Sequence, residues 1–163
     1  WSQVLGESIV GEMAGTELEK IPSDQVRYGD WKKQNPQGKV LSRDTGASRR
    51  YGSNPYGGYF SASSFATGLA NFEDDRLDKD EFVYGLTVGD RAIAYPVDLL
   101  KKNDKIVDEF KGQTFVFRHN EKLDTVRVFK KENGELTRIS PVSGFWFSWV
   151  TAHPDTKLNS PDE

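Results

Sequence analysis

The chain has 163 residues, no cysteine and a formal net charge of -3 at pH 7, with basic and acidic residues interspersed. Its length fits one compact domain with a hydrophobic core, and the lack of cysteine excludes disulfides and thiolate metal sites within these residues. No basic stripe is present to neutralise phosphates, so we expect no nucleic-acid partner. No apolar run approaches the roughly 18 residues of a membrane helix, and we expect no transmembrane segment.

The sequence begins at Trp1 rather than at Met. We therefore expect residues 1–163 to be a single β-rich domain that is part of a longer protein. Aromatic residues make up 12% of the chain, and its 15 glycines are spread along it. This pattern favours many short strands joined by tight turns.

The N-terminal part predicts a hairpin followed by a short helix. Residues 5–12 and 16–21 predict the two strands, because strand formers are separated there by glycine. Ser23 is a candidate N-cap for a Trp-bearing helix that ends before Pro36. Residues 39–42 predict a further short strand.

A stretch rich in glycine and tyrosine covers residues 43–71. It is too polar and too broken by glycine for a long helix or a central strand. Large rings are costly to leave in water and need to pack on something, so we predict a long ordered loop rather than a flexible linker. Long loops in compact domains often carry function.

The second half of the chain predicts an antiparallel meander. Residues 82–95 are the clearest hairpin, with Gly89-Asp90 at the turn and Pro96 at the end. The fold class is therefore mainly β (α+β), with short Trp-bearing helices and the long Gly/Tyr-rich loop. One helical turn is expected at residues 97–101, and further strands are expected at residues 105–110, 113–119, 124–129 and 136–139.

The sequence also contains an internal repeat. Residues 18–44 align without a gap on residues 136–162, at an offset of 118 (136 − 18). Unrelated segments of this length share about two identities by chance. Each copy predicts a strand, a short Trp-bearing helix, a proline stop and a second strand. The seven identical pairs are Leu18/Leu136, Ile21/Ile139, Trp31/Trp149, Pro36/Pro154, Lys39/Lys157, Ser42/Ser160 and Asp44/Asp162.

Motifs along most of the chain share the order and spacing of one family. They are Leu5-Gly6-Glu7-Ser8-Ile9-Val10-Gly11, Leu41-Ser42-Arg43-Asp44-Thr45-Gly46, Asn54-Pro55-Tyr56, Val83-Tyr84-Gly85, Ala94-Tyr95-Pro96 and Phe145-Trp146-Phe147-Ser148-Trp149. With them the chain resembles the family called domain of unknown function 3179. The resemblance implies an exported, often membrane-anchored prokaryotic protein, and it implies no assigned activity. Family members typically begin with another Ala-Tyr-Pro unit and a Cys-Pro-x-Cys stretch, so the cysteine-bearing segment is expected upstream of Trp1.

One motif suggests catalysis. Asp44-Thr45-Gly46-Ala47 has the form seen in aspartic proteases, where two carboxylates share one proton and one activates water. That chemistry needs an apolar strand leading to Asp44, yet Arg43 precedes it and the sequence has no second Asp-Thr/Ser-Gly. A homodimer could supply the second carboxylate. Asp44 is thus the weak catalytic candidate of a hydrolase alternative, and the favoured interpretation is a turn in which Gly46 has a positive φ.

The densest acidic run offers Asp74, Asp75 and Asp78 as oxygen ligands for calcium, the one cofactor that the sequence suggests. The glycine that bends an EF-hand loop is absent, so a solvated loop is the favoured interpretation. The two histidines, His119 and His153, are too few for a three-histidine zinc site.

Arginines and aromatic rings gather on the long loop. A guanidinium binds carboxylate bidentately and rings stack, so this pattern suits a small anionic or sugar-like ligand, or a protein partner. The alternative is a self-packed loop whose rings fill the core. The candidate ligand-binding residues are Arg43, Asp44, Arg49, Arg50, Tyr51, Asn54, Tyr56 and Tyr59.

Taken together, these patterns predict a β-rich module that binds a ligand or partner through this loop or serves as a structural subunit, and the family resemblance implies that it is extracytoplasmic. Hydrolysis at Asp44 and calcium binding are the two alternatives, and an enzymatic role is the less favoured expectation.

Overall fold

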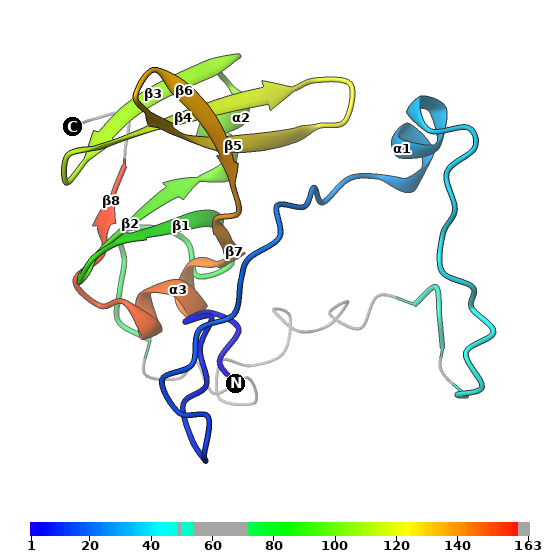
Figure 1. Cartoon of the computed structure of the whole chain (residues 1–163), viewed down its shortest axis with the longest axis horizontal. Coiled ribbons are helices and arrows are strands. Elements are labelled where there is room, and N and C mark those ends of the chain that lie inside the picture. Colours follow the sequence, from blue (N-terminus) through cyan, green and yellow to red (C-terminus); the bar gives the residue numbers. More distant parts are fainter. Residues whose placement is uncertain (49, 54–71, 160–163) are drawn as a thin grey trace. The chain divides into compact units, whose positions relative to one another are not determined.

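A computed structural model describes residues 1–48, 50–53 and 72–159 (Figure 1). The chain divides into two compact units, one of Trp1–Arg27 with Asp74–Glu163 and one of Tyr28–Glu73. Among the described residues, the strands all belong to the first unit, and the second unit holds the short helix α1 (Tyr28–Gln34). Within the described residues, no helix is long and apolar enough to cross a bilayer.

Two four-stranded sheets form the first unit. One has the strand order β7-β1-β2-β8 and the other the order β3-β4-β5-β6. Neighbouring strands are antiparallel, except that β8 pairs parallel with β2. The strands are β1 (Phe82–Val88), β2 (Arg91–Pro96), β3 (Lys105–Phe110), β4 (Gln113–Asn120), β5 (Thr125–Glu132), β6 (Glu135–Ile139), β7 (Val142–Phe145) and β8 (Lys157–Leu158).

Two tight turns set the register of the second sheet. Lys111 and Gly112 join β3 to β4 with φ values of 51° and 72°, and Asn133 and Gly134 join β5 to β6 with values of 51° and 86°. Positive φ at both central residues is typical of a type I′ turn, whose twist matches that of the paired strands. The turn residues therefore favour the antiparallel meander that the sequence predicts.

The main core lies between the two sheets. Tyr95 on β2 and Phe117 on β4 meet with ring centroids 4.4 Å apart, and both are almost fully buried. Leu100, on the short helix α2 (Val97–Lys101), joins the same cluster. The buried members are Leu86, Ile93, Tyr95, Leu100, Phe110, Phe115, Phe117, Val126 and Val128.

A second core lies on the other face of the first sheet, where helix α3 (Trp146–Ala152) packs (Figure 1). Side chains alternate between the two faces of a strand, so Leu86 faces the main core while its neighbour Gly85 faces α3. The indole of Trp149, which is 2% exposed, lies against Gly85. Gly85 pairs with Ala94 across the hairpin, so two small residues make room for the ring.

His153 is the C-cap of α3 and is half-buried. Its ring centroid lies 4.1 Å from that of Trp149, and its Nε2 is buried without a hydrogen-bond partner among the described residues. Burial, with a smaller contribution from Lys20, lowers the pKa of His153 from its usual 6.5. The folded protein therefore resists protonation of this imidazole.

Acidification is expected to destabilise the fold through His153. The pKa is lower in the folded than in the unfolded state, so the stabilisation is complete above about pH 6.5 and is lost as the pH falls toward the folded pKa. His153→Asn introduces the residue that stands at the equivalent position of the first repeat copy, Asn35. Denaturant unfolding at pH 7.5 and 5.0 should show a smaller loss of stability in this variant than in the parent, and an equal loss in both would contradict the assignment.

The prediction of a regular hairpin near the N-terminus is wrong. Residues 5–12 and 16–21 form no regular strand, and isolated bridges join Ser2 to Glu7 and Glu7 to Glu17. Three glycines in this segment have positive φ, which turns the backbone too often for a continuous ladder.

Other differences concern the two repeat copies. The helix predicted after Ser23 begins at Tyr28, and the strand predicted at residues 39–42 does not form. The second copy does provide strands on both sides of its helix, β7 before α3 and β8 after it. These short strands form because β1 and β2 offer them hydrogen-bonding edges.

The predicted fold class is confirmed: the chain is mainly β, with an antiparallel meander and short Trp-bearing helices. In the Gly/Tyr-rich loop, residues 43–48 and 50–53 contain no helix or strand. The rest of that loop, residues 49 and 54–71, lies outside the described residues.

Candidate ligand-binding cleft

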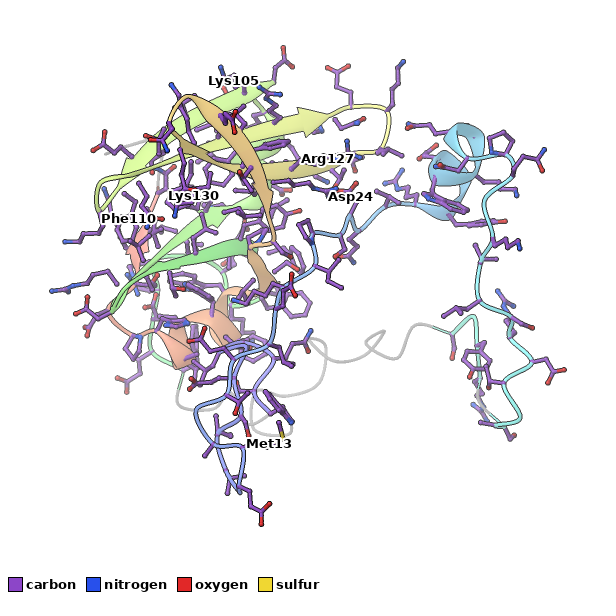
Figure 2. All side chains as sticks on the ribbon, viewed as in Figure 1. Met13, Asp24, Lys105, Phe110, Arg127 and Lys130 are labelled. Atoms are coloured by element: carbon purple, nitrogen blue, oxygen red, sulfur yellow. The ribbon has the colours of Figure 1, made fainter. Side chains whose placement is uncertain are left out.

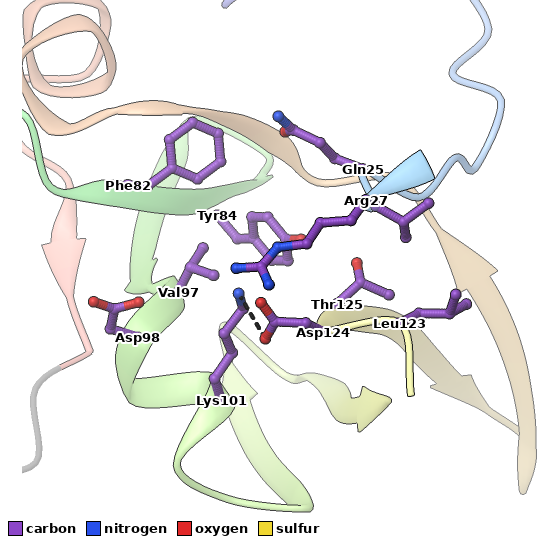
Figure 3. Close-up of a pocket in the computed structure, with 11 residues that line it drawn as sticks. Gln25, Arg27, Phe82, Tyr84, Val97, Asp98, Lys101, Leu123, Asp124 and Thr125 are labelled. Carbon is purple, nitrogen blue, oxygen red and sulfur yellow. Dashed lines mark ion pairs between the residues drawn. The ribbon is translucent and has the colours of Figure 1, made fainter. Parts of the chain in front are cut away.

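A cleft of about 390 Å³ opens in the first unit between residues 25–27, strand β1, helix α2 and the start of β5 (Figure 3). This volume is in the range of small-molecule sites. The cleft combines apolar walls with charged and hydrogen-bonding groups. Its lining residues are Gln25, Val26, Arg27, Phe82, Tyr84, Val97, Asp98, Lys101, Leu123, Asp124 and Thr125.

Residues 25–27, which form neither helix nor strand, make up one wall of the cleft. The preceding residue, Asp24, holds this segment in place. Asp24 accepts hydrogen bonds from Nε and Nη2 of Arg127, at 3.0 and 2.7 Å to Oδ2, and from Arg138. Figure 2 shows Asp24 beside Arg127. Bidentate arginine–carboxylate contacts fix orientation as well as position. Asp24 thereby places Gln25 and Arg27, which follow it, over the cleft.

The charged groups of the cleft come from both sides. Lys101 on α2 forms an ion pair of 3.0 Å with Asp124, which lies in the turn between β4 and β5. The Lys101 ammonium lowers the pKa of Asp124, and Arg27 adds a weaker attraction. Figure 3 shows the side chains of Arg27, Lys101 and Asp124 pointing toward one another.

A histidine lies beside this pair. The Nε2 of His119, on β4, is 3.8 Å from Oδ1 of Asp124, which is beyond hydrogen-bonding range. That nitrogen is buried, and no described residue hydrogen-bonds to it. His119 therefore contributes a charge to Asp124 only when it is protonated.

The floor of the cleft is partly aromatic. Tyr84 on β1 bonds to Thr125 through its side chain, and burial raises the pKa of Tyr84, so this phenol stays neutral. Phe82, two residues earlier on the same strand, lines the same side (Figure 3). The rings offer flat apolar surface next to groups that can donate and accept hydrogen bonds.

A second, groove-like hollow of about 580 Å³ lies near the β4–β5 turn and is lined by Arg118, His119 and Arg127, among others. Both arginines that line it already have a partner within the protein. Arg127 is bound to Asp24, and the guanidinium of Arg118 lies 5.2 Å from the ring centroid of Phe129. The first cleft is therefore the better candidate site.

The loop residues predicted to bind a ligand are only partly described. Asp44 is exposed and its backbone N–H donates to the hydroxyl of Ser42 at 3.0 Å, while Gly46 has the expected positive φ of 73°. The Tyr51 hydroxyl lies 2.9 Å from that of Thr45. Arg43 and Arg50 are exposed as well. Arg49, Asn54, Tyr56 and Tyr59 lie outside the described residues, so a site on this loop stays a prediction.

The acidic run holds a structural contact. Asp74 accepts hydrogen bonds from the Arg76 guanidinium and, at 3.1 Å, from the indole of Trp146. Arg76 lowers the pKa of Asp74. Within the described part of the chain, no group of three or more His, Asp or Glu side chains is placed to hold a metal ion. Calcium binding by Asp74 with Asp75 and Asp78 stays a prediction, and Asp74 would exchange its contacts for the ion.

The family of the chain follows from its sequence. The model described as protein of unknown function (DUF3179) matches residues 1–156. The chain belongs to the DUF3179 family. No curated protein and no solved structure gives a significant match to the DUF3179 chain.

Sequence reasoning missed the residues of the cleft. Arg27, Tyr84, Lys101 and Asp124 belong to four separate segments, and no motif joins them. Lys101 and Lys102 in particular have the pattern of a solvated lysine doublet. One signal in the sequence could have pointed to Lys101. It is the helical turn predicted at residues 97–101, which places Lys101 next to buried Leu100.

Proposed function

We propose that this DUF3179 chain is a binding module that takes a small polyhydroxylated, sugar-like ligand in the cleft beside Tyr84. The observation that supports this is the balance of hydrogen-bonding groups around the aromatic floor. Arg27 and Lys101 can donate, while Asp98 and Asp124 can accept.

The charge balance favours a polar ligand over a purely anionic one. Two cations and two carboxylates line the cleft, and one of each is already joined in the Lys101–Asp124 pair. A phosphate or simple carboxylate would meet Asp98 and Asp124 as like charges. Hydroxyl groups can donate to carboxylates and accept from arginine or lysine, so a sugar satisfies both kinds of group.

The aromatic floor supports the same ligand class. Phe82 and Tyr84 are neither buried completely nor fully exposed. Half-buried rings leave an apolar surface that can cover the C–H face of a sugar, while the polar rim fixes its orientation.

The experiment is calorimetric titration of the intact chain with glucose, N-acetylglucosamine and galacturonate, beside inorganic phosphate. We expect at least one sugar to bind, and Arg27→Ala and Asp98→Ala each to weaken it about tenfold, since a hydrogen bond to a charged group contributes about 1.5–3 kcal/mol. Arg91→Ala and Asp90→Ala are matched controls, because this exposed pair lies at the β1–β2 turn and lines neither hollow.

Two results would contradict the proposal. One is an equal loss of affinity in the cleft variants and the turn controls. The other is binding of inorganic phosphate with no binding of any sugar, which would indicate a simple anion site.

An extracytoplasmic location is part of this proposal. The family resemblance to exported proteins supports it, and a sugar-binding role suits a cell surface. Protease accessibility tests it on cells that carry the full-length protein and whose outer envelope is opened while the inner membrane stays intact, because only a cytoplasmic protein would then stay protected. Hydrolysis at Asp44 and calcium binding stay predictions.

A further inference from the structure

His119 lines the second hollow and also lies beside the ion pair of the cleft. Its Nε2 is 3.8 Å from Asp124, which lines the cleft. The His119 side chain is 12% exposed, and this nitrogen is buried with no hydrogen-bond partner among the described residues. Buried polar atoms without a partner are rare in native structures, so the position of this nitrogen points to a role.

One oxygen of Asp124 faces both the ammonium of Lys101 and the imidazole of His119. Oδ1 lies 3.0 Å from Nζ of Lys101 and 3.8 Å from Nε2 of His119. While the imidazole is neutral, only the lysine forms a charge-assisted hydrogen bond with this oxygen. A protonated imidazole donates from both ring nitrogens, and a shift of about 1 Å would bring Oδ1 within hydrogen-bonding range of Nε2.

The outcome of this competition depends on burial. The side chains of Lys101 and Asp124 are 29% and 49% exposed, and ion pairs with such access to water contribute little. A charged imidazole at the buried position of His119 is costly without a partner. Protonation of His119 therefore draws the carboxylate of Asp124 toward the ring, and Lys101 loses its partner.

The other charged groups nearby do not take the place of Asp124. Within the described part of the chain, Asp124 supplies the one carboxylate oxygen within 4.0 Å of the His119 Nε2. Asp104 meets His119 through its backbone carbonyl, which accepts the His119 N–H at 3.0 Å. The remaining charged side chains are Arg27, Asp98 and Lys101 in the cleft, and Arg118, Glu121, Lys122 and Arg127 in the second hollow.

We propose that His119 sets the ligand preference of the cleft: its protonation takes Asp124 from Lys101, and the freed ammonium then binds the carboxylate of an acidic sugar. This inference rests on the proposed function, because the acidic sugar occupies the same cleft. With His119 neutral, two cations and two carboxylates balance in the cleft and suit a neutral sugar. Protonation adds a positive charge beside them and favours a uronate.

The pH range of this change is accessible to experiment. Histidine is the side chain whose charge ordinarily changes between pH 5 and 8. A sugar carboxylic acid has a pKa of about 4 and so stays ionised across that range. Acidification therefore changes the charge of the protein beside the cleft and leaves the charge of a uronate unchanged.

Calorimetric titration with galactose and galacturonate at pH 7.5 and 5.5 tests the proposal, because the two sugars differ only at C6. We expect the preference for galacturonate to rise about tenfold at the lower pH, since one charge-assisted hydrogen bond is gained. His119→Gln and Lys101→Met should each abolish this rise. His153→Asn is the matched control, because it removes the other of the two histidines, at the end of α3, and should keep the rise.

Two results of this titration would overturn the inference and leave the proposed function intact. One is a parent protein that binds these sugars with the same preference at both pH values. The other is a rise of the parental size in His119→Gln. If that variant does not fold, Lys101→Met decides, because a rise that survives without the ammonium contradicts the inference equally.

A pH titration of the ligand-free chain followed by NMR separates this inference from the proposed function. We expect the ¹³C signal of the Asp124 carboxyl group to move together with the ring signals of His119, and this step to be missing in His119→Gln. An Asp124 signal that stays constant while His119 titrates would overturn the inference alone. The absence of binding by every sugar would remove the proposed function, and this inference with it.

Discussion

Gly85→Ala is expected to destabilise the first unit by about 3 kcal/mol, near the upper end of what overpacking costs in protein cores. A Cβ at this position would overlap three ring carbons of Trp149. The indole cannot retreat easily, because its Nε1 is bonded to Thr156 and the opposite face of β1 is packed against the main core. The added methyl group therefore forces α3 away from the sheet. Denaturant unfolding measures the change.

Gly144→Ala is the matched control. Gly144 is paired with Val83 on the neighbouring strand, and a Cβ there has no atom within 4 Å among its surroundings. Its effect should stay within about 1 kcal/mol, which is the ordinary range for glycine and alanine in a strand. Combining Gly85→Ala with Trp149→Leu should cost less than the sum of the two single changes, because the smaller side chain makes room for the methyl group. Strict additivity would show that Gly85 and Trp149 do not meet as described.

Asp24→Ala should destabilise the first unit by about 2 kcal/mol and weaken ligand binding in the cleft. The substitution leaves the guanidinium groups of Arg127 and Arg138 without their shared carboxylate. The cost is below the 3–5 kcal/mol of a fully buried pair, because each arginine side chain keeps about a third of its surface in water. Ligand affinity should fall because Arg27 is held over the cleft by this anchor.

Asp30→Ala serves as the control for that experiment. Asp30 also forms an ion pair, with Lys33 at 3.0 Å, but the lysine is 79% exposed and such surface pairs contribute little. Calorimetric unfolding and titration of both variants separate the two cases. An Asp24→Ala protein that keeps the parent's stability and affinity would show that the segment before α1 does not depend on its arginine contacts.

The sheets could be predicted from the sequence because their signals are local. Asn133-Gly134 specifies a type I′ turn, and the alternation around Leu86 and Ile93 places one face of the β1–β2 hairpin in a core. The helices of the repeat also followed from local pattern, through the tryptophan and the proline stop. Nothing in these signals depends on distant parts of the chain.

The N-terminal segment shows where local pattern is insufficient. Residues 5–12 have strand-forming side chains, but a strand also needs a neighbour with free hydrogen-bonding groups, and this segment meets only isolated bridges. The same reason separates the two repeat copies. Lys157 and Leu158 become β8 because β2 offers an edge, while the equivalent residues 39–40 form no strand.

The cleft could not be predicted for a related reason. Arg27 and Asp124 are 97 positions apart (124 − 27), and they meet because Asp24 ties its segment to β5 and β6. A single carboxylate in a polar stretch gives no sign of which arginines it will bind. The predicted site on the loop from Arg43 to Tyr59 was based on its composition of arginines and aromatic residues. Composition does not show how close these side chains lie to one another in the fold.

Assigned ¹H–¹⁵N spectra of the intact chain, titrated with the best-binding sugar, test the central proposal most directly. We predict that the largest shifts fall on Arg27, Tyr84, Lys101 and Asp124, and that the Asp98→Ala variant needs about ten times more sugar to reach them. Shifts confined to residues 43–53 would contradict the cleft as the site and would return ligand binding to the glycine- and tyrosine-rich loop.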